Sequence, residues 1–180
     1  MKYDLKIRIG TAEDAELLSE IGSETFWDTY GESPILNKND ISAYVKRAYD
    51  PELLRTELID EGFRYLIAVA DDETAGYARL KIGSPIENVE SERPLEISRI
   101  YIRRKFQGCG MGKELIGRCI EEAERFLCDA VWLGVWQYNE KAIGFYERMG
   151  FKSSGTMEFD LAGNLQTDIV MALFPESEAG

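Results

Sequence analysis

The sequence predicts an α/β fold, in which a mixed β-sheet of about seven strands carries about four helices on its faces. Segments with the apolar pattern of strands are interleaved with segments whose apolar residues recur at helical spacing. The expected order is β-α-α-β-β-β-α-β-α-β-β. A chain of 180 residues with 44% apolar residues can form one domain with a full core. We therefore expect a single domain over residues 1–174 and a disordered tail over residues 175–180.

Two helical regions are expected in the first half of the chain. Thr11 opens a capping box, T-A-E-D, in which Asp14 stands where the usual pattern has glutamate. Apolar residues at helical spacing continue this helix to about Asp28. The second region spans about 39–61, and Pro51 divides it because the residue before a proline disfavours helical backbone.

Strands and two further helices complete the predicted sheet. The strands are expected at residues 5–9, 65–70, 75–82, 95–102, 130–136, 151–160 and 165–174. The second and third enclose the acidic turn D-D-E-T and form a hairpin. One helix is expected over about 110–127. The other begins after Asn139, which caps it, and ends before Gly150.

Composition and charge exclude several classes of protein. Histidine is absent, which removes His-based catalytic triads and His metal sites, so no metal is expected. A net charge of −12 argues against nucleic acid as a partner. No apolar run approaches the ~20 residues that span a bilayer, and no signal peptide is evident, so we expect a cytoplasmic protein without a membrane partner. Cys109, Cys119 and Cys128 lack CxxC spacing and are expected to be reduced thiols.

Charge is unevenly distributed along the chain. Residues 1–96 hold 21 acidic and 11 basic side chains, whereas residues 97–113 hold five bases and no acid. The five bases are Arg99, Arg103, Arg104, Lys105 and Lys113. The acidic surface is explained by solubility alone, but a basic patch beside a glycine-rich loop indicates a phosphorylated ligand.

The segment Q-G-C-G-M-G-K-E-L-I, residues 107–116, has three glycines immediately before a helix. A dinucleotide motif would need glycine in place of Lys113 or Leu115, and a P-loop would need glycine in place of Gln107. Neither motif fits. Unpaired N–H groups at a helix N-terminus, together with the helix dipole, favour an anion, and glycines let a pyrophosphate come close. A connector without a ligand is the alternative.

Two motifs, in the expected order along the chain, resemble those of the GNAT N-acetyltransferase superfamily. Gln107, Gly110 and Gly112 fit the acetyl-CoA pyrophosphate pattern Q/R-x-x-G-x-G/A. The segment W-L-G-V-W-Q-Y-N-E-K-A-I-G-F-Y-E-R-M-G-F resembles the strand, the Asn-capped helix and the Y-x-x-x-G-F ending of that superfamily. The resemblance covers residues 95–174, and the first half agrees in its order of elements. Together with the late Q-T-D-I-V-M, these segments are most similar to the bacterial PaiA-type polyamine acetyltransferases.

The resemblance implies a mostly antiparallel sheet in which strands 95–102 and 130–136 splay apart around acetyl-CoA. The pantetheine arm would pair with exposed backbone of the first strand, and an N–H near Ile102 would face the thioester oxygen. The cofactor-binding residues so implied are Ile100, Tyr101, Ile102, Gln107, Gly108, Cys109, Gly110, Met111, Gly112, Lys113, Asn139 and Tyr146.

The implied reaction is direct transfer of the acetyl group to a primary amine in a ternary complex, with no acyl-enzyme. Tyr146 matches the family tyrosine that protonates the leaving thiolate, although its helical spacing also suits a core residue. An alkylamine with a pKa near ~10 arrives protonated, so a base is needed, and without histidine a carboxylate is the natural one. Glu96 matches a family glutamate base. A solvated charge, with an ordered water as the base, is the alternative.

A small polyamine such as spermidine or spermine is the favoured acceptor. Carboxylates of the first half would attract a polycation. They include Glu20, Glu24, Asp28 and Glu32. Trp27, Tyr30 and Glu32 are the candidate substrate-binding residues, because ring faces attract ammonium groups, although packing also explains the aromatic cluster. A protein N-terminus or lysine as acceptor, and a non-catalytic module that senses acyl-CoA, are the alternatives. The expected partner is a small-molecule amine, and a homodimer stays open.

Overall fold

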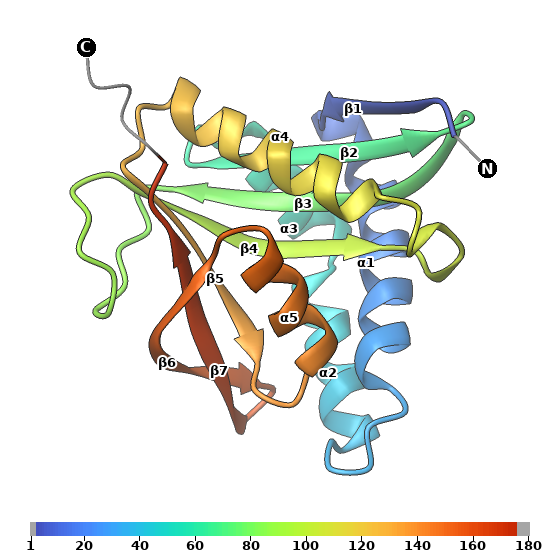
Figure 1. The fold of residues 1–180 in the computed structure, drawn as a ribbon. Coiled ribbons are helices and arrows are strands. Elements are labelled where there is room, and N and C mark those ends of the chain that lie inside the picture. Colours follow the sequence, from blue (N-terminus) through green and yellow to red (C-terminus); the bar gives the residue numbers. More distant parts are fainter. Residues whose placement is uncertain (1–2, 176–180) are drawn as a thin grey trace.

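Seven strands form one sheet within residues 3–175, the part of the chain that the computed structural model describes. The strands are β1 (Leu5–Ile9), β2 (Phe63–Ala70), β3 (Glu73–Ile82), β4 (Pro94–Ile102), β5 (Ala130–Trp136), β6 (Lys152–Leu161) and β7 (Asn164–Leu173). Their order in the sheet is β1-β2-β3-β4-β5-β7-β6, and every neighbouring pair is antiparallel except β4 and β5 (Figure 1). The predicted mixed, mostly antiparallel sheet is confirmed.

Five α-helices lie within the described residues. They are α1 (Ala15–Tyr30), α2 (Lys38–Ala48), α3 (Pro51–Ile59), α4 (Met111–Arg125) and α5 (Glu140–Arg148). The predicted second helical region is two helices, divided at Pro51 as expected. Asp50 caps α3, since its carboxylate accepts hydrogen bonds from the N–H groups of Glu52 (3.0 Å) and Leu53 (3.1 Å). The capping box at Thr11 and Asp14 is also present.

Helices cover both faces of the sheet, and each face has its own apolar core. α4 and α5 cover one face with residues such as Leu115 and Tyr146. α1, α2 and α3 cover the other with residues such as Ile21, Ile41 and Leu54. Both cores include residues of β2, β3 and β4, because successive side chains of a strand point to opposite faces. The two sides of the site described below therefore belong to two different layers.

The parallel strands β4 and β5 pair over three residues and then part. In the described structure, Pro94, Leu95 and Glu96 pair with Ala130, Val131 and Trp132, and the pairing goes no further. Figure 1 shows the two strands diverging from this end of the sheet. The predicted splay of these strands is confirmed, and it leaves backbone groups of β4 free on the side that faces β5.

β4 also carries a β-bulge at Ser98. In the ladder between β3 and β4, Ile97 pairs with Leu80 and Arg99 pairs with Arg79, so that Ser98 is the extra residue. Its hydroxyl donates a hydrogen bond to the carbonyl of Arg79 (3.1 Å). The predicted strand did not include this irregularity.

No helix in residues 3–175 is long and apolar enough to cross a membrane. Residues 176–180, most of the tail that the sequence predicts to be disordered, lie outside the described residues, as do residues 1–2.

Candidate active site

The glycine-rich loop leads directly into α4. Gly108 (φ 78°) and Gly110 (φ 87°) have left-handed backbone, which glycine adopts without strain, and Gly110 is the residue that precedes the helix. A Cβ added at either position would meet no described atom within 4 Å, so the backbone here is open to an approaching group. The first N–H groups of a helix have no intrahelical acceptor. The loop therefore presents unshielded donors at a helix N-terminus, which suits the pyrophosphate of CoA.

Gln107 connects this loop to β4 and α5. Its Nε2 donates a hydrogen bond to the carbonyl of Ile102 (3.1 Å), while its Oε1 accepts one from Lys141 Nζ (3.2 Å). The first residue of the predicted phosphate motif thus fixes the loop against the end of the splayed strand. Cys109 is an exposed free thiol in the same loop, whereas Cys119 and Cys128 are buried.

The basic run of residues 97–113 does not form one phosphate-binding patch, which corrects the sequence prediction. Arg103 pairs with Glu20 (3.2 Å) and Glu24 (3.0 Å) of α1, and Arg104 pairs with Asp28 (3.2 Å). Lys105 pairs with Glu73, and Arg99 lies on the opposite face of the sheet from α4. Three of the five bases are thus paired with acidic neighbours, and Lys113 lies beside the loop on the first turn of α4.

The free edge of β4 presents backbone groups to the gap between β4 and β5. The N–H of Arg103 donates to the carbonyl of Ala75 in the neighbouring hairpin (2.8 Å), and alternation along a strand turns Tyr101 the same way. The N–H groups of Ile100 and Ile102 therefore point toward the gap. This is the orientation that the pairing of a pantetheine arm with these residues requires.

Asn139 and Tyr146 lie on α5, at the same gap. The side chain of Asn139 caps the helix by accepting a hydrogen bond from the N–H of Ala142 (3.2 Å). Tyr146 is buried in the core under α4 and α5. Burial raises the pKa of Tyr146 well above its ordinary value, and the nearby Tyr30 of α1 raises it further. The phenol therefore stays protonated at neutral pH.

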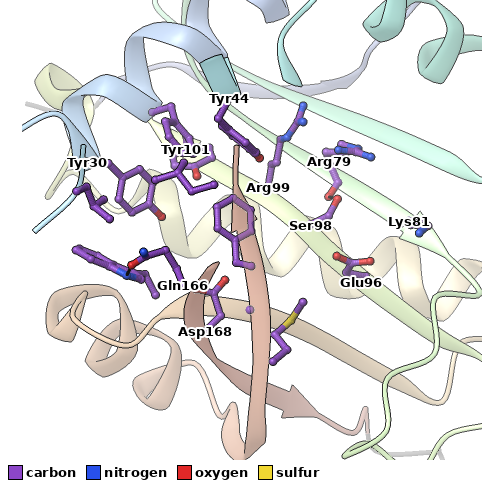
Figure 2. Close-up of a pocket in the computed structure, with 17 residues that line it drawn as sticks. Tyr30, Tyr44, Arg79, Lys81, Glu96, Ser98, Arg99, Tyr101, Gln166 and Asp168 are labelled. Carbon is purple, nitrogen blue, oxygen red and sulfur yellow. Dashed lines mark hydrogen bonds between the residues drawn. The ribbon is translucent and has the colours of Figure 1, made fainter. Parts of the chain in front are cut away.

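A cavity of about 240 Å³ lies on the opposite face, beneath α1 and α2. It opens where β4 and β5 have parted. The lining residues there include Tyr101, Gly134 and Trp136, which come after the last residues that pair β4 with β5. Figure 2 shows its polar side chains converging, with Glu96 and Lys81 at one end and Tyr30 and Gln166 at the other. We call this space the acceptor cavity.

Two carboxylates line the acceptor cavity. Glu96, the predicted base, lies on β4 and accepts a hydrogen bond from the hydroxyl of Ser84 (2.7 Å). Asp168 lies on β7 over Gly134, where an added Cβ would come within 3.2 Å of its carboxylate. Burial raises the pKa of Asp168 from 3.8 to about 6. Sequence reasoning missed Asp168, although a charged residue inside the apolar run of the last strand was a visible signal.

Arg99 is the second residue that sequence reasoning did not assign to the site. Its side chain is buried, lines the acceptor cavity and stacks on the ring of Tyr49, with the guanidinium carbon 4.5 Å from the ring centroid. Its Nη1 has no hydrogen-bond partner among the described residues. The neighbouring Arg79, in contrast, pairs with Glu57 (3.0 Å).

The structure separates the three predicted substrate-binding residues. Tyr30 lines the acceptor cavity and packs edge-on against Trp136, with ring centroids 5.7 Å apart. Trp27 packs against the core under α1 and does not line the cavity. Glu32 is exposed beyond the end of α1. Of this set, only Tyr30 therefore lies with Glu96 in the cavity.

Comparison with known proteins agrees with this geometry. The acetyltransferase (GNAT) family profile matches residues 24–151. The chain belongs to the GNAT acetyltransferase family. An uncharacterized N-acetyltransferase from the pepI 3′ region of Lactobacillus delbrueckii subsp. lactis is 31% identical over 84% of this chain and 86% of its own. The expected enzyme class, an N-acetyltransferase, is confirmed.

Two further proteins are similar to this chain, one over nearly its whole length and one over about a third of it. The PaiA N-acetyltransferase of Thermoplasma acidophilum, solved in complex with coenzyme A, superposes with a TM-score of 0.75 at 24% identity, over 95% of this chain and 99% of that one. The spermine/spermidine N(1)-acetyltransferase of Bacillus subtilis is 32% identical over 36% of this chain and 43% of its own. Family membership confirms the expected cofactor, acetyl-CoA.

Proposed function

We propose that this GNAT protein transfers the acetyl group of acetyl-CoA to the primary amine of a small molecule held in the acceptor cavity. The observation that carries the proposal is the position of this cavity. It opens on one side of the gap between β4 and β5, while the glycine-rich loop, Asn139 and Tyr146 lie on the other. An amine in the cavity and a thioester in the gap would meet without either crossing the sheet.

The donor side would hold the cofactor through backbone groups. When bound, acetyl-CoA supplies the activated acetyl thioester. The N–H groups of the loop at Gly108 and Gly110 would receive its pyrophosphate, and those of Ile100 and Ile102 would pair with its pantetheine arm. The N–H near Ile102 would stabilise negative charge on the thioester oxygen. The contribution of the chain here is orientation and fixed dipoles, which cost no reorganisation during the reaction.

A carboxylate of the cavity would take the proton of the incoming ammonium group. Glu96 is the base that the family resemblance implies, and its hydrogen bond from Ser84 holds it in place. Asp168 is the second candidate. A pKa of about 6 leaves it ionised at neutral pH yet more basic than an ordinary aspartate, which suits a general base. Asp168 lies over Gly134, which comes after Trp132, the last residue of β5 that pairs with β4, and this puts Asp168 next to the gap.

Tyr146 would donate the proton that the leaving thiolate needs. Its raised pKa keeps the hydroxyl protonated, and its position on α5, in the core shared with α4, would bring it near a cofactor bound in the gap. A buried phenol without an acceptor among the described residues is ready to donate to a group that arrives with the cofactor.

A polyamine such as spermidine or spermine is the more specific acceptor that the family resemblance favours. The partial match to the Bacillus subtilis spermine/spermidine enzyme supports it, and so do the aromatic rings and the two carboxylates of the cavity. The acidic face of α1 supports it less, because Glu20, Glu24 and Asp28 already pair with Arg103 and Arg104.

Release of the CoA thiol from acetyl-CoA, measured across a panel of amines, tests the proposal. The panel contains spermidine, spermine, putrescine, free amino acids and peptides with free N-termini. Turnover with any small amine supports the proposal, and the preferred member identifies the acceptor class. Turnover with peptides alone would move the assignment to a protein acetyltransferase. Binding of acetyl-CoA with no turnover on any amine would favour a sensing module and contradict the proposal.

The same assay separates the two candidate bases. Asp168→Asn and Glu96→Gln are isosteric changes, and each removes one proton acceptor from the cavity. The variant that lowers kcat about 10²-fold or more identifies the base. Equal, small effects would assign the proton to an ordered water.

A further inference from the structure

We propose that the acceptor amine also carries a carboxylate, and that this carboxylate pairs with Arg99. The inference rests on the proposed function and names the chemical class of its acceptor. It follows from a positive charge that the chain has placed inside its own acceptor cavity without a partner.

The environment of Arg99 gives its charge no counter-ion. The residue is 8% exposed, and no carboxylate of the described residues forms an ion pair with it. Its guanidinium stacks on Tyr49, and its Nη1 has no hydrogen-bond partner in residues 3–175. A buried charge with unmade hydrogen bonds is costly to the folded chain. A ligand that pairs with the guanidinium would offset this cost.

The carboxylates and tyrosines of the cavity do not complete Arg99. Glu57 of α3 is engaged by Arg79 and by the hydroxyl of Tyr65. Glu96 accepts its hydrogen bond from Ser84. Asp168, the other carboxylate that lines the cavity, lies over Gly134 and forms no ion pair with Arg99 in residues 3–175. The surrounding tyrosines have their pKa raised by burial and stay neutral, so they offer dipoles and no charge. An anion from outside is therefore the missing partner.

The bulge at Ser98 is what turns Arg99 into the cavity. Leu95 and Ile97 point into the core under α4, and strict alternation would send Arg99 the same way. Because Ser98 is the extra residue, Arg99 and Tyr101 face the cavity while Ile100 and Ile102 return to the core. β-Bulges next to active sites commonly re-aim a side chain. Here the re-aimed side chain is a cation.

The chemistry of a guanidinium selects the kind of anion. Its planar fork of N–H donors matches the two oxygens of a carboxylate, and the Tyr49 ring behind it holds the plane in place. The cavity, at about 240 Å³, lies below the roughly 300–1,000 Å³ of drug-sized pockets, so the acceptor is compact. An amino acid, or another small amine that carries a carboxylate, fits both the size of the cavity and the chemistry of Arg99.

The charge of the cavity also bears on the polyamine alternative. Arg99 has no counter-ion, and Lys81 lines the same cavity. Glu96 and Asp168 offset these two cations, so the cavity has no net attraction for a polycation. Any positively charged nitrogen of spermidine or spermine that lay beside Arg99 would be repelled. A carboxylate-bearing amine instead brings one negative group for Arg99 and one amine for Glu96 or Asp168.

Matched acceptors test the inference with the unmodified protein. Each pair differs only in the carboxylate: lysine and cadaverine, ornithine and putrescine, phenylalanine and phenethylamine. Phenylalaninamide, in which a neutral amide replaces the carboxylate, is an analogue of similar size. We expect kcat/KM to be about 30-fold or more higher for the carboxylated members, the effect of completing a buried charge pair. Equal or better use of the carboxylate-free members, spermidine included, would overturn the inference.

Substitution of Arg99 provides the second arm. Arg99→Met should raise KM for carboxylated acceptors about 30-fold or more, leave KM for acetyl-CoA unchanged and abolish the preference within each pair. Arg99→Lys should recover part of the preference, since it keeps the charge and loses the fork. The matched control is Arg64→Met. Arg64 also stacks on a ring (Phe126, 5.2 Å) and has an Nε without a hydrogen-bond partner among residues 3–175. It differs from Arg99 in that it has a counter-ion, Glu122 (3.8 Å), and does not line the acceptor cavity.

A binding measurement separates this inference from the proposed function. A carboxylated acceptor should raise the Tm of the wild-type protein and of Arg64→Met, but not that of Arg99→Met. Turnover of amines with no preference for the carboxylate would overturn the inference and leave the proposed function standing. Absence of turnover with every amine, despite acetyl-CoA binding, would overturn the proposed function and this inference with it.

Discussion

Ser98 and Arg99 are neighbours in β4, yet both side chains line the acceptor cavity. In a regular strand one of them would face the core under α4. Omitting Ser98 from the segment L-E-I-S-R-I-Y-I leaves L-E-I-R-I-Y-I, which alternates perfectly between apolar and polar residues. The strand is therefore a regular one with a single inserted residue, and that residue lies where β4 turns away from β5.

Deletion of Ser98 should preserve the core and damage the site. The apolar face stays intact, and only the hydrogen bond to the Arg79 carbonyl is lost, so we expect the free energy of unfolding to fall by about 1 kcal/mol. The pairing with β3 can persist, because Ile97 and Arg99 already pair with the consecutive residues Leu80 and Arg79. A bulge bends its strand and increases the local twist, so its removal would straighten β4 and shift Ile100 and Ile102 relative to β5. Because a misplacement of about 1 Å can cost 10²-fold, kcat/KM should fall about 100-fold or more.

Ser98→Ala is the matched control for this deletion. It removes the same hydrogen bond and keeps the bulge, so its unfolding free energy should fall by a similar amount while kcat/KM stays within a few-fold of wild type. Chemical denaturation and steady-state kinetics measure the two effects. A deletion variant that is fully active would show that the bulge has no part in positioning the site.

Two glycines near the start of α4 should respond to alanine in opposite ways. Gly110 has φ 87°, and a Cβ there meets no described atom within 4 Å, so Gly110→Ala bears only the cost of left-handed backbone, about 1–2 kcal/mol. It should also raise KM for acetyl-CoA, since the new methyl group stands in front of the loop donors. Gly117 lies inside the helix with equally open space, so Gly117→Ala should stabilise by about 0.5–1 kcal/mol.

Thermal unfolding and the KM for acetyl-CoA check this pair together. A lower Tm for Gly110→Ala beside a higher Tm for Gly117→Ala is the expected result. If both variants bind acetyl-CoA as the wild type does, the loop at Gly110 is a connector and does not hold the pyrophosphate.

The donor half of the site was predictable because its signals are local. The glycine spacing from Gln107 to Gly112 and the cap at Asn139 act within a few residues of chain, and the structure contains both. The acceptor half depends on long-range geometry. Asp168 reaches the cavity because β7 pairs with β5, and Arg99 reaches it because of one inserted residue. A single sequence shows such residues as breaks in a pattern, but it does not tell which cavity they enter.

Tyr146→Phe should lower kcat and leave cofactor binding intact. The ring stays packed between Phe145 and Phe151, with centroids at 5.3 Å and 6.0 Å, so the core is unchanged. Loss of a general acid typically costs 10²–10⁴-fold. Tyr138→Phe, at an exposed tyrosine of the same region, is the control and should keep full activity. An active Tyr146→Phe enzyme would make Tyr146 a core residue and no more.

Asp168 should limit activity on the acid side of neutrality. Its pKa of about 6 predicts that kcat/KM rises with pH through about 6 and then levels, as the carboxylate becomes able to accept a proton. In Asp168→Asn this limb should vanish along with most of the rate. A wild-type profile that is flat between pH 5 and 7, with Asp168→Asn fully active, would contradict a role in proton transfer.

The same group makes a prediction about stability with a definite sign. Because the folded pKa of Asp168 lies above its unfolded value of 3.8, ionisation favours the unfolded chain, and the penalty grows from pH 3.8 to about pH 6. Asp168→Asn should therefore be more stable than wild type by about 1–3 kcal/mol at pH 7 and equal to it near pH 3.5.

Substitution of Asp129 should have the opposite effect on stability. Hydrogen bonds from Ser91 and from the N–H of Glu92 hold the pKa of this exposed carboxyl at about 2, so Asp129→Asn should destabilise at pH 7, and the difference should disappear as the pH falls toward 2. Urea denaturation of the two variants across this pH range measures both effects. The protein should become more stable when the charge of Asp168 is removed and less stable when that of Asp129 is removed, which distinguishes a carboxylate kept for function from one kept for stability.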